Sequence, residues 1–341
     1  MNPARDWNAF WFGPVSARPL GLFRIVFGLV TLANLAFLSF EMDYWLTDVG
    51  LLQGTEALEV AGPSRPSPLN WVQDPTSMHV FFAATAAVAV LVTIGWRTRL
   101  MSILLYLMML SIHHHNVLTS SGSDTLVMII TFYVMLCPCG AAYSLDARRE
   151  ARRRGTPAEP LILPWSQRLI QLQISLIYFN TAILKCNGVT WLNGTALHYV
   201  LNNSEVGYLR LDPLTQYPVA VNILTYGAVL IEFALAFLLW FRATRPWMIV
   251  AGLALHVGIH LMVNIPIFGE MMAACYICFL QPDEVDVVLR RLNPAHWFRR
   301  PRRSTVAAAI PGRVDAPSVL PRPHLTEAAC RQAREAVKRD D

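Results

Sequence analysis

Eight apolar stretches separated by polar joints constrain the fold of this chain more than any other feature. They cover residues 20–40, 79–95, 100–117, 124–139, 167–184, 219–241, 247–263 and 267–280. Most reach the length of about 17 to 25 residues that a helix needs to cross the hydrocarbon core of a bilayer. Helices are the expected form because a backbone in lipid must satisfy its own hydrogen bonds. We therefore predict an all-α, polytopic membrane bundle of about eight transmembrane helices, the last of them short.

The composition agrees with a membrane protein. Hydrophobic residues make up 54% of the 341 residues and charged residues only 15%, whereas soluble domains carry about 25% charged residues. Of the 28 basic residues, 25 fall in the amino-terminal part, in alternate joints or in the tail. Because Lys and Arg collect in cytoplasmic joints, both termini are expected to be cytoplasmic. The basic runs adjoin helix ends without an aromatic platform, so we expect the lipid bilayer and no nucleic acid as a partner.

The chain divides into three parts by composition. Residues 1–18 form a cytoplasmic amino-terminal segment, residues 19–281 form the transmembrane domain, and residues 282–341 form a basic, largely disordered cytoplasmic tail. The tail is rich in Pro, Arg and Ala, and such a segment buries too little apolar surface to order itself.

Lys185 is the most informative single residue, because it ends the otherwise apolar fifth stretch. Gln171, Ile174, Tyr178, Thr181 and Lys185 follow one another at spacings of three and four, which places them on one face of a helix. Two interpretations remain open. The lysine either extends to the outer headgroups, or lies in a pocket where desolvation frees its amine to act as a base. The second requires a dry amine without a permanent counter-charge.

Two histidines of the seventh stretch, His256 and His260, are four residues apart and share a helix face. This spacing suits a metal, but no nearby residue fixes a third ligand, so hydrogen bonding within the bundle is favoured and no metal is expected. The cysteines, including Cys137 and Cys139, are interpreted as small packing residues.

Four further ionisable residues lie in or at the ends of the stretches, where charge is costly. They are Arg24, Asp124, Glu232 and Glu270. We interpret them as structural polar groups, and we expect Arg24 to form a buried ion pair with Asp124 or Glu232.

Several short segments, in order, carry a family resemblance over residues 19–281. They are PLGLFRIVFG, SPLNW, GWRTRL, YSLD at 143–146, YFNTAILKCNGVTWLNGTALHY around Lys185, HLMVN and IFGEMM. With these segments the chain resembles the horizontally transferred transmembrane (HTTM) family, which is similar to the membrane domain of vitamin K-dependent gamma-carboxylase and includes sporulation-delaying protein B. The resemblance implies a multi-pass protein of the cell membrane, in bacteria the inner membrane.

The resemblance also implies a site. In the carboxylases a lysine matching Lys185 is thought to deprotonate a reduced quinone, the vitamin K hydroquinone, and His260 matches a second functional residue. A substrate or cofactor pocket would then include Tyr178, Thr181, Trp191, His256 and Asn264. Two departures argue against a true glutamate gamma-carboxylase. Ser123 and Asp124 stand where the carboxylases carry a functional histidine, and the chain stops soon after the bundle.

Two classes of function follow. The first is a quinol- and oxygen-dependent modifying enzyme with Lys185 as base and His260 assisting, whose substrate is a small molecule or is presented by a partner protein. The second is a non-catalytic membrane factor for maturation or export of a secreted peptide, like sporulation-delaying protein B. Metal or proton transport is less favoured because no broken helix or internal repeat supports it.

Overall fold

The computed structural model describes residues 3–50, 67–72, 74–115, 121–155, 160–203, 212–263 and 265–292. The regular structure in these ranges is helical apart from one antiparallel pair, β1 (Val15–Ser16) with β2 (Leu161–Ile162). The prediction of an all-α bundle is therefore confirmed.

The helices follow one another along the chain with few long interruptions. The first half contains α1 (Pro3–Phe12), α2 (Arg18–Phe40), α3 (Met42–Leu46), the 3-10 helix η1 (Pro68–Trp71), α5 (Pro75–Ile94), α6 (Thr98–His115), α7 (Gly122–Leu136), η2 (Cys139–Ala141) and α8 (Leu145–Arg154). The second half contains α9 (Trp165–Cys186), α10 (Val189–Leu192), α11 (Ala196–Asn202), α12 (Asp212–Thr215), α13 (Pro218–Leu238), α14 (Arg245–Met262), α15 (Phe268–Tyr276), η3 (Ile277–Phe279) and α16 (Pro282–Leu292).

Each of the eight apolar stretches coincides with helical structure. Within the described ranges, five helices are long and apolar enough to cross a membrane, namely α2, α5, α9, α13 and α14. The helix α7 is shorter, and the eighth stretch divides into α15 and η3. A multi-pass membrane protein is therefore supported, whereas the number of eight crossings and the side of each terminus stay predictions.

Local sequence explains where several helices begin and end. The side chain of Asp74 accepts a hydrogen bond from the Ser77 N–H at 2.9 Å and caps α5. Ser121 and Asp124 form a reciprocal capping box at the start of α7. Gly95 ends α5 with φ of 74°, a left-handed conformation that glycine adopts without steric cost.

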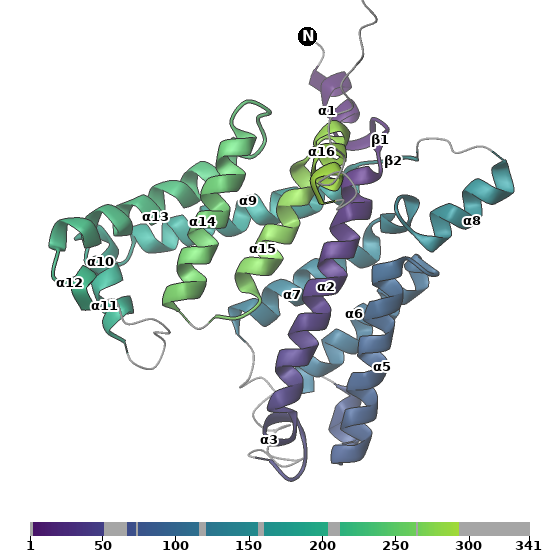
Figure 1. The fold of residues 1–341 in the computed structure, drawn as a ribbon, viewed down its shortest axis with the longest axis horizontal. Coiled ribbons are helices and arrows are strands. Elements are labelled where there is room, and N and C mark those ends of the chain that lie inside the picture. The colour runs from purple at the N-terminus through teal and green to yellow at the C-terminus, as the bar shows by residue number, and fades with distance from the viewer. Residues whose placement is uncertain are drawn as a thin grey trace, which may run out of the picture. The chain divides into compact units, whose positions relative to one another are not determined.

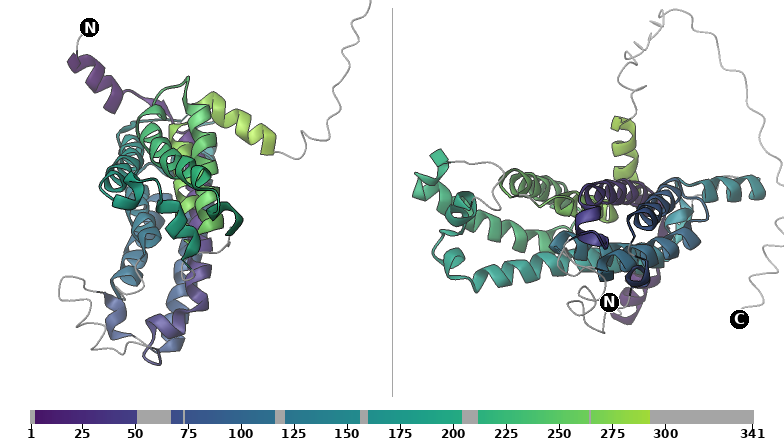
Figure 2. Two further views of the ribbon diagram at one scale, coloured as in Figure 1. Left: turned by 90° about the vertical axis from the view of Figure 1, so that its left-hand side faces the viewer. Right: turned by 90° about the horizontal axis from the view of Figure 1, so that it is seen from below.

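The helices pack as two groups with α2 between them (Figures 1 and 2). One group contains α5, α6 and α7, and the other contains α9, α13 and α14. The helix α2 packs along α5, α9 packs along α13, and α15 contacts both α2 and α14. Large apolar side chains on the facing surfaces are fully buried, among them Phe23, Phe27, Ile130, Ile174 and Met271.

Arg24 of α2 is completely buried, but it does not form the predicted ion pair. Its Nη1 donates to the carbonyl oxygens of Cys139 and Ala142 at 3.2 and 3.4 Å, and its Nη2 donates to that of Tyr143 at 2.7 Å. The prediction of a partner in Asp124 or Glu232 is thus wrong. The reason is that the turn after α7 brings backbone carbonyls to the two Nη atoms of the guanidinium, which take the place of a carboxylate.

Asp146 completes this region, which we call the arginine joint (Arg24, Gly95, Thr98, Ser144 and Asp146). The Asp146 carboxylate accepts hydrogen bonds from the Arg97 N–H at 2.9 Å and from the Thr98 N–H and hydroxyl at 2.7 Å, and so caps α6. Burial alone would raise the pKa of Asp146, but these hydrogen bonds outweigh it and lower the pKa from 3.8. The segments PLGLFRIVFG, GWRTRL and YSLD therefore meet at one place.

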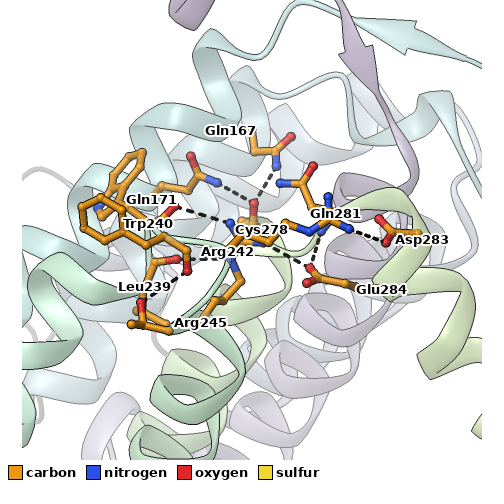
Figure 3. Close-up of polar contacts among 12 residues, drawn as sticks. Gln167, Gln171, Leu239, Trp240, Arg242, Arg245, Cys278, Gln281, Asp283 and Glu284 are labelled. Carbon is orange, nitrogen blue, oxygen red and sulfur yellow. Dashed lines mark hydrogen bonds and ion pairs between the residues drawn. The ribbon is translucent and has the colours of Figure 1, made fainter.

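A second polar region joins the starts of α9, α14 and α16 (Figure 3). Gln167 and Gln171 both donate to the Cys278 carbonyl oxygen, at 2.6 and 2.7 Å. Arg245 donates to Glu284 at 3.2 Å and to the Leu239 carbonyl at 3.2 Å. These contacts hold α16, so the first eleven residues of the predicted disordered tail are helical. Residues from 293 onward lie outside the described residues.

Candidate functional site

Lys185 lies in the last turn of α9 and forms an ion pair with Glu232 of α13. The Lys185 and Glu232 side chains are 22% and 7% exposed. The Nζ atom also lies 4.8 Å from the centre of the Trp191 ring, which adds a cation–π contact. Three helices, α9, α10 and α13, are thus joined by one amine.

The pair does not lie at the start of α13. Glu232 is about 21 Å along that helix from Pro218, at 1.5 Å per residue. The short helices α10 and α11 lie beside the intervening part of α13, since Tyr226 donates to the Leu192 carbonyl at 2.9 Å and Thr225 accepts from the Leu197 N–H at 3.3 Å. Lys185 therefore points into the bundle and does not extend away from its end.

Neither interpretation of Lys185 from the sequence matches this geometry. The lysine does not extend outward, and its amine has the counter-charge that the role of a base excludes. The requirement that the amine be unpaired is therefore contradicted.

Tyr178, His256 and Tyr276 form a second buried group, the Tyr178 cluster. The Tyr178 hydroxyl is hydrogen-bonded to His256 Nε2 at 2.6 Å and to the Tyr276 hydroxyl. The three residues come from α9, α14 and α15, and all are almost completely buried. At Gly252 a Cβ atom would lie 2.2 Å from the Tyr276 oxygen, so glycine leaves the space for this hydroxyl.

The sequence prediction brought Tyr178 and His256 to one pocket but missed Tyr276. The signal was a single tyrosine inside the apolar eighth stretch, where a hydroxyl needs a hydrogen-bond partner. Two atoms of the region, Glu232 Oε2 and His256 Nδ1, are buried and have no hydrogen-bond partner among the described residues. Buried polar atoms are usually paired, so these two need an explanation.

The remaining predicted site residues contribute no side chain to this cluster. The Thr181 hydroxyl donates to the Ile177 carbonyl of its own helix at 2.9 Å. His260 is exposed, with Nδ1 3.6 Å from Glu270 Oε1, and the side chains of both are about half exposed. His260 lies one turn further along the same face of α14 than the buried His256, near the end of the helix, where its side chain is exposed. Asn264 lies outside the described residues.

Asp124 has a local role. Its carboxylate accepts hydrogen bonds from the N–H and the hydroxyl of Ser121, at 2.9 and 2.8 Å. It therefore stabilises the start of α7, where a negative charge is favourable. Within the part of the chain that the structure describes, no three His, Cys, Asp or Glu side chains gather closely enough to hold a metal ion.

Comparison with known proteins identifies the family. The model of the HTTM domain matches residues 12–283, so the chain belongs to the HTTM family. It is 22% identical over 245 residues to the uncharacterized protein YitO of Bacillus subtilis (strain 168), covering 67% of this chain and 76% of YitO. It is 23% identical over 214 residues to the sporulation-delaying protein SdpB of the same strain, covering 60% of this chain and 64% of SdpB. No solved structure matches the chain.

Proposed function

We propose that this protein is a non-catalytic membrane factor that supports the maturation or export of a secreted peptide. The observation that carries the proposal is the Lys185–Glu232 ion pair, because the enzymatic alternative expects an amine without a permanent counter-charge. The similarity to the sporulation-delaying protein SdpB agrees with this class. Ser123, in place of the carboxylase histidine, supports it as well.

In this proposal the ion pair acts as a clamp. It ties the end of α9 to α13, and through Trp191 it fixes the start of the short helices that follow. These helices expose large apolar side chains, including Val189, Leu192 and Tyr199. Exposed apolar residues on an ordered support are suited to contact an apolar peptide segment. The clamp would keep this surface in one conformation.

A membrane enzyme is the second candidate, and the Tyr178 cluster is the observation that favours it. A line of buried hydroxyl and imidazole groups can pass a proton, and Glu232 Oε2 and His256 Nδ1 are buried without partners. A reduced quinone as cofactor belongs to this candidate alone. The enzyme requires an amine at position 185, whereas the non-catalytic factor requires only that positions 185 and 232 form a stable pair.

Reversal of the charge pair separates them. Lys185→Glu alone should destabilise the protein, because two carboxylates would face each other, and Lys185→Glu with Glu232→Lys should restore the pair. Cells that express each full-length variant are compared by mass spectrometry of secreted peptides and of membrane extracts. The proposal expects the double variant to recover both the amount of folded protein and the product profile.

A double variant that folds at the wild-type level but gives the profile of cells without the protein would refute the proposal in favour of the enzyme. If the reversed pair does not fold, Lys185→Met with Glu232→Leu replaces it, since apolar residues of similar volume often replace a buried pair without loss of stability. The matched control is reversal of the exposed Arg242–Asp283 pair, which should change neither measurement.

A further inference from the structure

A cavity of about 260 Å³ lies where α9, α14 and α16 begin, in the polar region of Figure 3. Its polar lining residues include Ser16, Gln167, Arg168, Arg245 and Gln281. The volume is below the range of about 300 to 1,000 Å³ that is typical of drug-sized ligands, so the cavity suits a small chemical group. The Lys185–Glu232 pair and the Tyr178 cluster do not line it, so it is distinct from the site described above.

The charges of the lining select an anion. Arg168 and Arg245 contribute two guanidinium groups, and no Asp or Glu is among the lining residues. Arg245 is compensated by Glu284 at 3.2 Å and is fixed by its bond to the Leu239 carbonyl. Arg168 forms no ion pair with any described residue, and its side chain donates to the Gln171 amide oxygen at 2.9 Å. The cavity therefore carries a positive charge that lacks a counter-charge, and such a charge attracts an anion.

The Arg168 guanidinium is held in position for a ligand. It lies 4.5 Å from the centre of the Phe10 ring of α1, and Gln171 holds its Nη1 atom. Its Nη2 atom has no hydrogen-bond partner in the described part of the chain, and it is not among the enclosed unpaired atoms. A guanidinium that stacks on a ring keeps its N–H donors in the plane of its edge, which suits the oxygens of a phosphate.

Two neutral donors accompany Arg168. The side-chain amide of Gln281 lines the cavity and makes no hydrogen bond to a described residue. The Ser16 hydroxyl accepts a hydrogen bond from the Arg18 N–H at 3.4 Å, and its own proton has no acceptor among the described residues. Donors from α9, from β1 and from the turn before α16 thus surround one small cavity. Arginine together with neutral donors is the usual set of groups that contact phosphate oxygens.

The position of the cavity along the helices agrees with a phosphate. Both α9 and α14 are long and apolar enough to cross a membrane, and the cavity lies at their first residues. Lipid headgroups lie at this level of a spanning helix. The amino-terminal ends of helices also carry a partial positive charge that favours anions.

We propose that this cavity binds a phosphate group, either that of a lipid headgroup or a soluble phosphate. Arg168 supplies the charge, and Gln281 and Ser16 supply neutral hydrogen bonds. Arg245, held by Glu284, adds to the positive potential of the wall. The proposal does not depend on the role of Lys185 or on the maturation of a peptide.

Thermal unfolding of the purified full chain in an uncharged detergent tests the proposal with three probes. They are dioctanoyl phosphatidate, dioctanoylglycerol, which lacks the phosphate, and inorganic phosphate. A compound that binds the folded state raises the melting temperature. We expect phosphatidate to raise it by several degrees and dioctanoylglycerol to leave it unchanged. A rise with inorganic phosphate assigns the cavity to a soluble phosphate, whereas a rise with phosphatidate alone assigns it to a lipid headgroup. No rise with either phosphate compound, or an equal rise with dioctanoylglycerol, would overturn the proposal.

Substitution of Arg168 gives the second measurement. Arg168→Gln should weaken the binding of the phosphate compound about tenfold, the value of one charge-assisted hydrogen bond, and Arg168→Lys should keep part of the affinity. The control is Arg154→Gln, which changes the net charge equally but removes an exposed arginine of α8 that does not line the cavity. Equal losses in Arg154→Gln and Arg168→Gln would show non-specific attraction and would refute the site.

Gln281→Leu provides a test that leaves every charge in place. The affinity should fall about threefold, because one neutral hydrogen bond is lost. The backbone N–H of Gln281, which donates to Glu284 at 2.7 Å, is retained in this variant, so the start of α16 should stay folded. This variant decides the matter if Arg168→Gln does not fold, and an unchanged affinity would refute the proposed donor set.

Discussion

The arginine joint and the Lys185–Glu232 pair handle buried charge in opposite ways. In the joint, Arg24 donates to three backbone carbonyls, whose positions are fixed by the path of the chain. In the pair, Lys185 meets the side chain of Glu232, and a side chain can be exchanged without altering the backbone. The first arrangement therefore depends on the fold itself. In the second, both side chains can be replaced by another matching pair while the helices stay in place.

The largest expected effect is at Arg24. Arg24→Met should abolish folded protein, since three buried carbonyls lose their donors at a cost of at least about 4 kcal/mol. The measurement is size-exclusion chromatography of the detergent extract. Arg24→Lys should recover part of the folded protein, because one ammonium cannot reach all three carbonyls. If Arg24→Met gave a sharp peak of wild-type height, the arginine joint would not be required for folding, and it would not differ from the Lys185–Glu232 pair in this respect.

Breaking the Lys185–Glu232 pair should cost less stability than the loss of Arg24, and a second substitution should recover part of that cost. Lys185→Ala leaves Glu232 buried and unpaired, at a cost of about 3 kcal/mol, and addition of Glu232→Ala should recover part of it. Melting temperatures of the purified variants in detergent provide the comparison. Losses that simply add would mean that the two residues are not coupled, and the clamp would then be rejected.

Asp146 offers a test by pH. Asp146→Asn should cost about 1 kcal/mol as the loss of a helix cap. Because the folded-state pKa of Asp146 lies below 3.8, its stabilisation is complete above the ordinary carboxyl pKa and is lost as the pH falls through the lowered value. The difference in melting temperature between wild type and Asp146→Asn should therefore shrink below about pH 3.8 and be constant at pH 5 to 8. A constant difference down to the acid limit would contradict the capping role.

The smallest effect should be at Arg242, whose ion pair with Asp283 is mostly exposed. Arg242→Ala should change stability by no more than about 0.5 kcal/mol. Arg245 lies three residues later in the chain and is buried against Leu239 and Glu284, so Arg245→Ala should cost clearly more stability. Chemical denaturation of the two variants side by side measures the contrast, and equal losses would show that burial does not decide the value of these arginines.

Hydropathy predicted the helices well, because the eight apolar stretches all coincide with helical structure. The spacing of Tyr178 and Lys185 also placed them on a common face of α9 correctly. The partners were not predictable in the same way. We predicted a carboxylate partner for Arg24, whereas its acceptors are backbone carbonyl oxygens. Every residue carries a backbone carbonyl, so the sequence does not indicate which of them will reach the guanidinium. Lys185 was assigned no counter-charge, because nothing in the sequence states how far α13 extends past the end of α9.

Tyr276 shows the same limit. Tyr276 was overlooked because a lone tyrosine in an apolar stretch resembles a packing residue until its hydroxyl partner is known. Periodicity reports the face of one helix, and the meeting of several faces requires the packed bundle.

The arginine joint has a consequence for biogenesis. The acceptors of Arg24 lie 115 to 119 residues later in the chain, which at ribosomal speed means a delay of roughly ten seconds. During that time the first half of α2 carries an unsatisfied guanidinium, at a cost of up to about 3 kcal/mol, the value for a charge at the bilayer centre. Release of this helix into lipid should therefore await the arrival of η2, so that the amino-terminal half is inserted as a unit rather than helix by helix.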